Sequence, residues 1–279
     1  MKNPKTLYIL ISLFCFFAII AGICSEFLIK KADENNVNNP NVNDIQENIE
    51  KAQEEVKQQF SELFNNTINA EQYDFSNINK IDQQKEIVYS AYTIQKQENN
   101  YEVNINLPAI NIYGKVPVSF NKITQEIFAN KASEVLNSNN SYKTIYNVDY
   151  VSCINGNILS VAIKSTLKEG NNPQRVIVQT YNYNLVTGEK VDFNSCITGL
   201  QLNTKDIQTK IDRNISKAAE EANILAQSGY NVYKRDLNSE MYKINNISTF
   251  LLDENANLYV IFAYGNQNFT SEMDVVLFE

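Results

Sequence analysis

The pattern of apolar and polar positions divides the 279-residue chain into three parts. Residues 6–29 form an almost unbroken apolar run, TLYILISLFCFFAIIAGICSEFLI, which Lys30 and Lys31 follow at once. A helix needs about 20 mostly apolar residues to cross the hydrocarbon core of a membrane. The run therefore predicts a transmembrane helix, and residues 1–31 are interpreted as a membrane anchor.

Basic residues flank both ends of this run, so charge alone gives it no clear orientation. Lys2 and Lys5 precede it, whereas Lys30 and Lys31 follow it. A first apolar segment usually inserts as a signal anchor. We therefore expect a single-pass protein of the cell membrane, with the bulk of the chain extracytoplasmic and no cytoplasmic domain before the anchor.

Two processed forms are alternatives to an uncleaved anchor. A signal-peptide cleavage site needs small residues at alternate positions, and Ala21-Gly22-Ile23 fits this pattern poorly. A lipoprotein would carry its lipid on Cys24, where Ile23 takes the place of the usual small residue. All three forms export the rest of the chain.

Residues 32–84 are predicted to form an acidic linker followed by a stalk helix. Residues 32–43 are rich in asparagine, contain Pro40 and show no apolar period, which is typical of a flexible linker. Residues 33–82 hold eleven acidic and three basic side chains, a net charge of −8 that equals that of the whole chain. The apolar residues that then recur at helical spacing are Ile45, Ile49, Ala52, Val56, Phe60 and Leu63. We expect this stripe to pack on the following domain or on itself.

Residues 85–279 show the patterns of a folded domain. Alternating apolar positions predict a pair of strands over residues 87–94 and 101–107. Asn155-Gly156 lies between two further alternating runs and is a strong hairpin signal. It belongs to a predicted four-strand antiparallel meander. The meander strands are residues 149–154, 157–167, 175–185 and 190–193.

Two helices and three more strands complete this domain. The first helix covers residues 120–136 with Ser119 as its cap, and the second runs from Thr204 as N-cap to Gly229 just past its end. The last strands are residues 249–252, 258–264 and 273–278. Separate runs of strands and helices predict an α+β fold, an antiparallel meander sheet with two segregated packing helices. A division into subdomains 85–145 and 146–279 fits this order.

The composition restricts the chemistry that the chain can perform. It has no histidine, which excludes Ser-His-Asp and Cys-His catalytic units and the usual catalytic zinc sites. A carboxylate pair of glycosidase type is the remaining catalytic option. The candidates Glu220-Glu221 and Asp253-Glu254 fall on the polar side of a helix and in a turn. We therefore expect no enzyme activity, cofactor or metal. We also expect no nucleic-acid partner, because binding one would require a basic face.

Two further features are candidates for a functional role. Cys153 and Cys196 are the only cysteines outside the apolar run. They could form a disulfide in an oxidising compartment, and two buried free thiols are the alternative. The segment GYNVYKRDLNSEMY follows the second predicted helix and is a candidate recognition loop. Its candidate contact residues are Tyr230, Tyr233, Lys234, Arg235 and Tyr242.

Residues 181–197, YNYNLVTGEKVDFNSCI, resemble the strand-turn-strand pattern YNFDLKTGKxLxLxDLF of an exported bacterial module. That module is found in lysozyme-sensing anti-sigma factors and beside the catalytic domain of some peptidoglycan deacetylases. Residues 101–110 and 248–266 are similar to other parts of it, so the resemblance extends over residues 85–279. The family's Gly-Gly-Ala-His turn is replaced by Gly170-Asn171-Asn172-Pro173. Any role of that histidine therefore does not transfer.

The resemblance implies a sensing or accessory module without its cytoplasmic or catalytic companions. We expect a membrane-anchored binding domain whose ligand is a protein such as lysozyme or a component of the cell wall. The acidic charge favours the cationic protein. A carboxylate-dependent envelope hydrolase and a structural partner of another membrane protein are the alternatives. The abundance of asparagine, lysine and isoleucine is typical of an AT-rich genome and suggests a Gram-positive bacterium.

Overall fold

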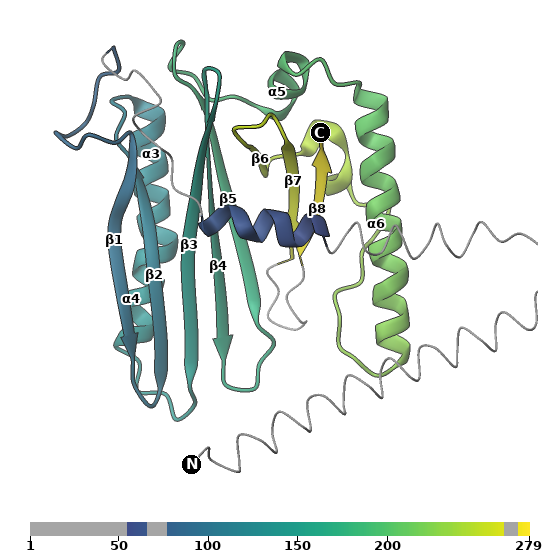
Figure 1. The fold of residues 1–279 in the computed structure, drawn as a ribbon. Helices are drawn as coiled ribbons and strands as arrows, with labels where there is room; N and C mark the ends of the chain where they lie inside the picture. Colours follow the sequence, from purple (N-terminus) through teal and green to yellow (C-terminus); the bar gives the residue numbers. More distant parts are fainter. Residues whose placement is uncertain (1–54, 66–76, 265–272) are drawn as a thin grey trace, which may run out of the picture. The chain divides into compact units, whose positions relative to one another are not determined.

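The computed structural model describes residues 55–65, 77–264 and 273–279, all of which belong to one unit of the chain, residues 51–279. The predicted membrane anchor, the linker over residues 32–43 and the first part of the stalk helix lie outside the described residues. Within the described residues, no helix has the length and apolar character needed to cross a membrane. The described chain forms a five-stranded and a three-stranded sheet with helices packed against them (Figure 1).

The larger sheet has the strand order β1-β2-β3-β4-β5. Its strands are β1 Val88–Gln97, β2 Tyr101–Ile110, β3 Thr144–Asn155, β4 Ile158–Glu169 and β5 Arg175–Asn184. Neighbouring strands pair antiparallel, except that β2 and β3 are parallel and are joined through a helical crossover. The hairpin between β3 and β4 is confirmed, although its two loop residues are Gly156 and Asn157, because Asn155 pairs with Ile158. Only Gly156 has a positive φ, +54°.

The prediction of a fourth meander strand over residues 190–193 is wrong. A single bridge joins Tyr183 and Lys190, and helix α5 Phe193–Gly199 begins directly afterwards. The Asp192 carboxylate accepts a hydrogen bond from the N–H of Ser195 and caps this helix. Strands β3, β4 and β5 therefore form a three-strand antiparallel meander. The hairpin β1–β2 extends the sheet, because β2 pairs parallel with β3.

One face of the larger sheet is covered by a long helical segment. It consists of α3 Lys115–Thr124, the π-helical turn η3 Gln125–Ala129 and α4 Asn130–Leu136 (Figure 1). This is the first predicted helix, but it begins after Gly114 rather than at a Ser119 cap. Its buried side chains pack on the inward residues of the sheet and form the first hydrophobic core.

The smaller sheet is antiparallel and lies against a second core. Its strands are β6 Phe250–Leu252, β7 Leu258–Ala263 and β8 Met273–Phe278. Helix α6 Thr204–Gln227 contributes Ile207, Ile211 and Ile215 to the second core. Two short 3₁₀ turns, η4 Glu240–Tyr242 and η5 Ile244–Asn246, connect this helix to β6.

The ends of α6 agree closely with the sequence pattern. The N-cap is Asn203 rather than Thr204, because the Asn203 side chain accepts the N–H bonds of the first turn. Gly229 lies just past the end of the helix at φ +89°, as predicted. The N–H of Tyr230 bonds to the carbonyl of Leu225, which completes a Schellman-type end.

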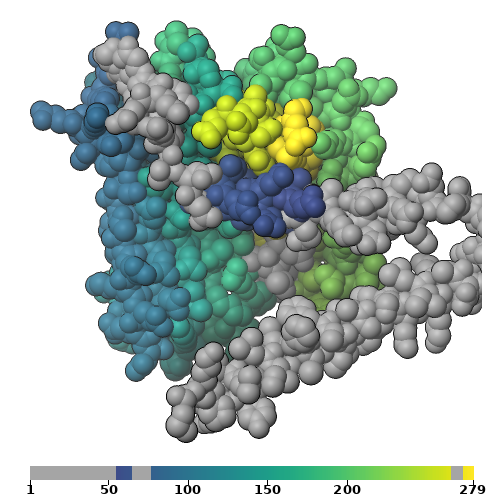
Figure 2. Space-filling model, viewed as in Figure 1, coloured from purple at the N-terminus to yellow at the C-terminus, as the bar shows by residue number. Residues whose placement is uncertain are grey.

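Residues 55–65 form a short helix that lies on the other face of the larger sheet, and we call this segment the strap (Figures 1 and 2). Its Phe60 is fully buried. Phe60 belongs to a cluster with Val151 and Ala162 of the larger sheet and Tyr259 of the smaller one. The strap therefore packs on both sheets, as expected for the apolar stripe of the stalk helix.

Candidate functional site

The predicted recognition loop is largely built into the second core. Tyr242 is only 2% exposed, and the side chain of Arg235 is only 4% exposed. Tyr230 and Lys234 remain on the surface, whereas Tyr233 is half-buried. The segment is therefore not an exposed loop that presents all five predicted contact residues.

A hydrogen-bonded network explains this burial. Arg235 and Asp274 form a bidentate ion pair with N–O distances of 3.0 and 3.1 Å. The Tyr264 hydroxyl donates to the same carboxylate at 2.6 Å and lies 3.0 Å from the Tyr242 hydroxyl. Tyr233 stacks on the Tyr264 ring with a centroid distance of 4.3 Å. Because protein groups satisfy the buried charges, the network fixes the fold of this segment.

Cys153 and Cys196 are free thiols, so the disulfide considered from the sequence is not formed. Cys153 lies on β3 in the cluster beneath the strap, whereas Cys196 lies on α5 in the second core. Burial raises the pKa of Cys153 to about 12 and that of Cys196 to about 11. Neither thiol is therefore a reactive nucleophile at neutral pH.

The carboxylates considered for catalysis have ordinary positions. Asp253 is 3% exposed, and it accepts hydrogen bonds from Asn255 and Asn257 that fix the turn between β6 and β7. Glu220 is exposed on α6. In the part of the chain that the structure describes, no three acidic or cysteine side chains gather in a group that could hold a metal ion.

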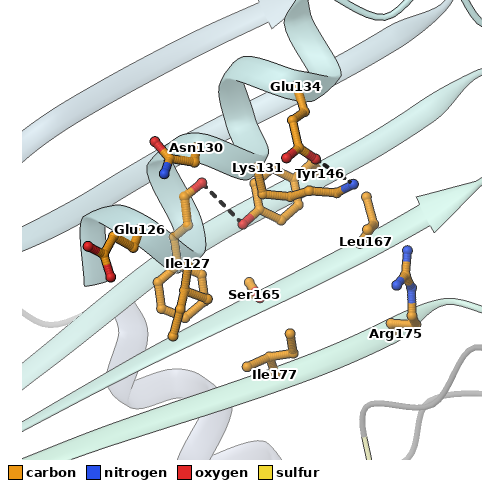
Figure 3. A pocket seen from close by; sticks show the side chains of 11 residues that line it. Glu126, Ile127, Asn130, Lys131, Glu134, Tyr146, Ser165, Leu167, Arg175 and Ile177 are labelled. Atoms are coloured by element: carbon orange, nitrogen blue, oxygen red, sulfur yellow. Dashed lines mark hydrogen bonds and ion pairs between the residues drawn. The ribbon is translucent and has the colours of Figure 1, made fainter. Parts of the chain in front are cut away.

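The structure instead places a pocket of about 310 Å³ beneath the π turn, on the helix-covered side of β3, β4 and β5 (Figure 3). Strand residues form the floor of the pocket. The strand register places Tyr146, Leu167 and Arg175 side by side, and it pairs Ser165 with Ile177. The helical wall is formed by Glu126, Ile127, Phe128, Asn130, Lys131 and Glu134.

The π turn itself forms part of this wall. The N–H of Asn130 bonds to the carbonyl of Gln125, five residues back instead of four. The Tyr146 hydroxyl donates to the carbonyl of Phe128 in this turn at 3.4 Å. Burial raises the pKa of Tyr146 well above its usual value, so this group is a protonated donor at neutral pH. Single π turns occur frequently at functional sites.

The charged groups around the pocket are paired with one another. Lys131 lies 3.2 Å from Glu134 and 4.0 Å from Glu169, and Glu169 also pairs with Arg175. The pocket lining therefore has two bases opposed by two acids, Glu126 and Glu134. A wall of this kind gives little net attraction for a free ion.

The rim of the pocket is apolar and accessible. Ile127 is 43% exposed and Ile177 is 46% exposed, although both line the cavity. Together with the hydroxyls of Tyr146 and Ser165, they suit a group that is mostly apolar and has a hydrogen-bonding edge. An aromatic or amide-bearing side chain has this character.

The spacing of the buried helix residues explains the π turn, but the sequence alone does not mark these positions, because Thr124 is polar. The buried positions Phe120, Thr124, Phe128 and Ala132 are spaced by four residues three times in succession. This spacing exceeds the α-helical period of about 3.6 residues, so a regular helix would rotate the stripe away from the sheet. The π turn absorbs the additional residue and keeps the stripe on the core.

The sequence matches no protein-family model and no curated protein. Solved structures similar to the chain include a DUF3298 family protein from Pseudomonas aeruginosa PAO1, with 11% identity and a TM-score of 0.33 over 65% of this chain and 84% of that chain. They also include a member of the same family from Bacteroides fragilis, with 11% identity and a TM-score of 0.32 over 67% of this chain and 90% of that chain. These neighbours belong to a bacterial domain family of unknown function. At these TM-scores the similarity supports no conclusion about ligand or activity.

Proposed function

We propose that this chain is a membrane-anchored, extracytoplasmic binding module without enzyme activity, and that it recognises a basic protein such as lysozyme through the pocket beneath the π turn. Residues 6–29 supply the anchor in this proposal. The observation that carries it is the exposed apolar rim formed by Ile127 and Ile177 around a charge-balanced cavity.

The size of the pocket favours an anchoring side chain over a large cofactor. Its volume of about 310 Å³ is at the lower end of the range of about 300–1,000 Å³ for ligand sites. Protein interfaces often concentrate their binding energy in one aromatic or aliphatic side chain that fills such a cavity. The hydroxyls of Tyr146 and Ser165 could then bond to the polar edge of that side chain.

The charge of the whole chain favours a basic partner. A net charge of −8 and a sequence pI of about 4.8 attract a cationic protein over long distances. Such attraction mainly raises the association rate and weakens as salt is added. The resemblance of residues 181–197 to the lysozyme-sensing module supports the same class of ligand.

The full chain in detergent micelles, immobilised and exposed to purified lysozyme at low and at moderate salt, tests this proposal. We expect binding at both salt concentrations, with lower affinity at the higher one. Ile177→Asp places a carboxylate on the apolar rim and should weaken binding by about tenfold or more. Absence of binding by the unmodified chain at both salt concentrations would contradict the proposal.

Ile224→Asp is the matched control, because Ile224 is 61% exposed and lies on α6, outside the pocket lining. We expect this variant to bind lysozyme as the unmodified chain does. Equal losses in the two variants would show that added negative charge, rather than the pocket, determines the result.

A further inference from the structure

The face of the larger sheet opposite α3 and α4 carries two ordered rows of polar side chains. On each strand these residues alternate with the side chains of the first core. The register places Gln95, Asn104, Asn147 and Thr166 side by side across β1, β2, β3 and β4. The second row consists of Thr93, Asn106, Asp149 and Lys164. We call these eight residues the amide face, and the face of the sheet that carries them is turned toward the viewer in Figures 1 and 2.

Hydrogen bonds hold the amide groups in fixed orientations. Asn104 donates to the side-chain carbonyl of Asn147 at 3.0 Å, and Asn147 donates to the Thr166 hydroxyl at 3.4 Å. In the second row, Asn106 donates to Asp149 at 3.0 Å. These side chains are only partly buried. Because an amide has two N–H donors and a carbonyl with two lone pairs, each keeps hydrogen-bonding capacity toward solvent.

The charges on and beside the amide face nearly balance one another. Asp149 and Lys164 are register partners on β3 and β4, and Glu102 and Lys143 form an ion pair of 2.9 Å at the end of the face. Lys168 follows Thr166 on the same side of β4, in register with Ile145 and Glu102, and adds a third base. Two acids and three bases leave this surface with a net charge of only +1. It therefore offers little to a strongly charged polymer and suits an uncharged partner with many hydrogen-bonding groups.

The strap borders the amide face. The Nζ atom of Lys164 lies 5.4 Å from the centre of the Phe64 ring, and Phe64 is half-buried. Beyond Lys164 on β4, the next residue on this face is Ala162, which the strap covers. The polar rows thus end at an aromatic side chain that can contact the carbon–hydrogen face of a bound ring.

We propose that the amide face binds an uncharged glycan strand that crosses β1–β4. Neighbouring strands are spaced by about 4.8 Å, which is close to the length of one pyranose unit in an extended glycan. Each strand therefore offers one hydrogen-bonding side chain for each sugar. Sugar hydroxyl and acetamido groups donate and accept as the amides do, and the preoriented side chains lower the entropic cost of binding. This site is separate from the pocket, which lies on the other side of the sheet.

Titration of the full chain in detergent micelles with chitohexaose, a neutral β-1,4-linked N-acetylglucosamine oligomer, tests this inference by isothermal calorimetry. We expect saturable binding and no binding of anionic polygalacturonate. Thr166→Val removes the hydroxyl that accepts the hydrogen bond from Asn147 but keeps a β-branched side chain that suits a strand. This variant should weaken chitohexaose binding by about tenfold.

The control is Ser165→Ala, because Ser165 neighbours Thr166 on β4 but lines the pocket on the opposite face. We expect it to bind chitohexaose like the unmodified chain, and thermal melts of both variants establish that they are folded. The inference is overturned if the unmodified chain shows no saturable binding. It is also overturned if Ser165→Ala weakens binding as much as Thr166→Val, or if polygalacturonate binds more tightly than chitohexaose.

Discussion

At the scale of single residues, the ion pair between Arg235 and Asp274 dominates the electrostatics of the second core. Both side chains are almost fully buried, with 4% and 7% exposed. Asp274→Asn keeps the shape of the side chain but leaves the guanidinium without its carboxylate partner. We expect the free energy of unfolding to fall by about 3–5 kcal/mol, as when one member of a buried pair is removed. Urea denaturation of the full chain followed by circular dichroism measures this change.

Asp236→Asn is the control for this experiment, because Asp236 is an exposed acid on the same segment. Its stability should change by no more than about 0.5 kcal/mol. A similar small effect of Asp274→Asn would mean that Arg235 is not held by the buried pair. The segment 230–242 would then remain a candidate recognition loop.

The sequence could not reveal the roles of these residues. It shows Arg235 among tyrosines, which is typical of a binding surface, but its partner Asp274 lies 39 positions away. Only the pairing of β7 with β8 brings Tyr264 and Asp274 together. The pocket is likewise built from residues that are distant in the sequence, since Tyr146, Ser165 and Ile177 come from three different strands. Local patterns therefore indicate which residues are polar, but not which of them meet.

At the scale of secondary-structure elements, the strap depends on one buried ring. Phe60 is fully buried and its centroid lies 5.8 Å from that of Tyr259. Phe60→Ala should weaken the docking of the strap by about 3–5 kcal/mol, the usual cost of such a truncation in a core. Cys153 lies in the cluster beneath the strap, whereas Cys196 does not. Thiol labelling followed by site-resolved mass spectrometry should therefore become faster at Cys153 and stay slow at Cys196.

Ser61→Ala is the matched variant for the strap, because Ser61 is exposed on the same helix. It should leave the labelling of both cysteines unchanged. An equal increase at both sites in Phe60→Ala would indicate global unfolding. The strap would then not be a separately docked element.

Elements were predictable where a local period determines them. Alternation identified β1–β5, and the apolar stripe and Gly229 identified α6, because these patterns reflect burial on one face. The parallel pairing of β2 with β3 was not predictable, since it depends on the path of the crossover. The sequence of residues 190–193 wrongly predicts a strand, because four positions are too few to distinguish the alternation of a strand from the first turn of α5.

At the scale of the whole molecule, the buried tyrosine hydroxyls and cysteine thiols predict how the free energy of unfolding depends on pH. The chain has no histidine, so few side chains titrate between about pH 5 and 8. Burial raises the pKa of Tyr242 and Tyr259 to about 12 and that of Cys196 to about 11. We therefore expect a free energy of unfolding that is almost constant near neutral pH and falls at alkaline pH.

The direction follows from the difference between the two states. An unfolded tyrosine loses its proton near pH 10, whereas folded Tyr242 and Tyr259 keep theirs up to about pH 12. Their contribution to stability is complete below about pH 10 and is lost as the pH rises toward 12. Urea unfolding at a series of alkaline pH values, together with tyrosinate absorbance, tests this, and Tyr259→Phe should make the decline less steep. Titration of all tyrosines near pH 10 in a chain that stays folded would contradict the prediction, because buried hydroxyls would then ionise as freely as exposed ones.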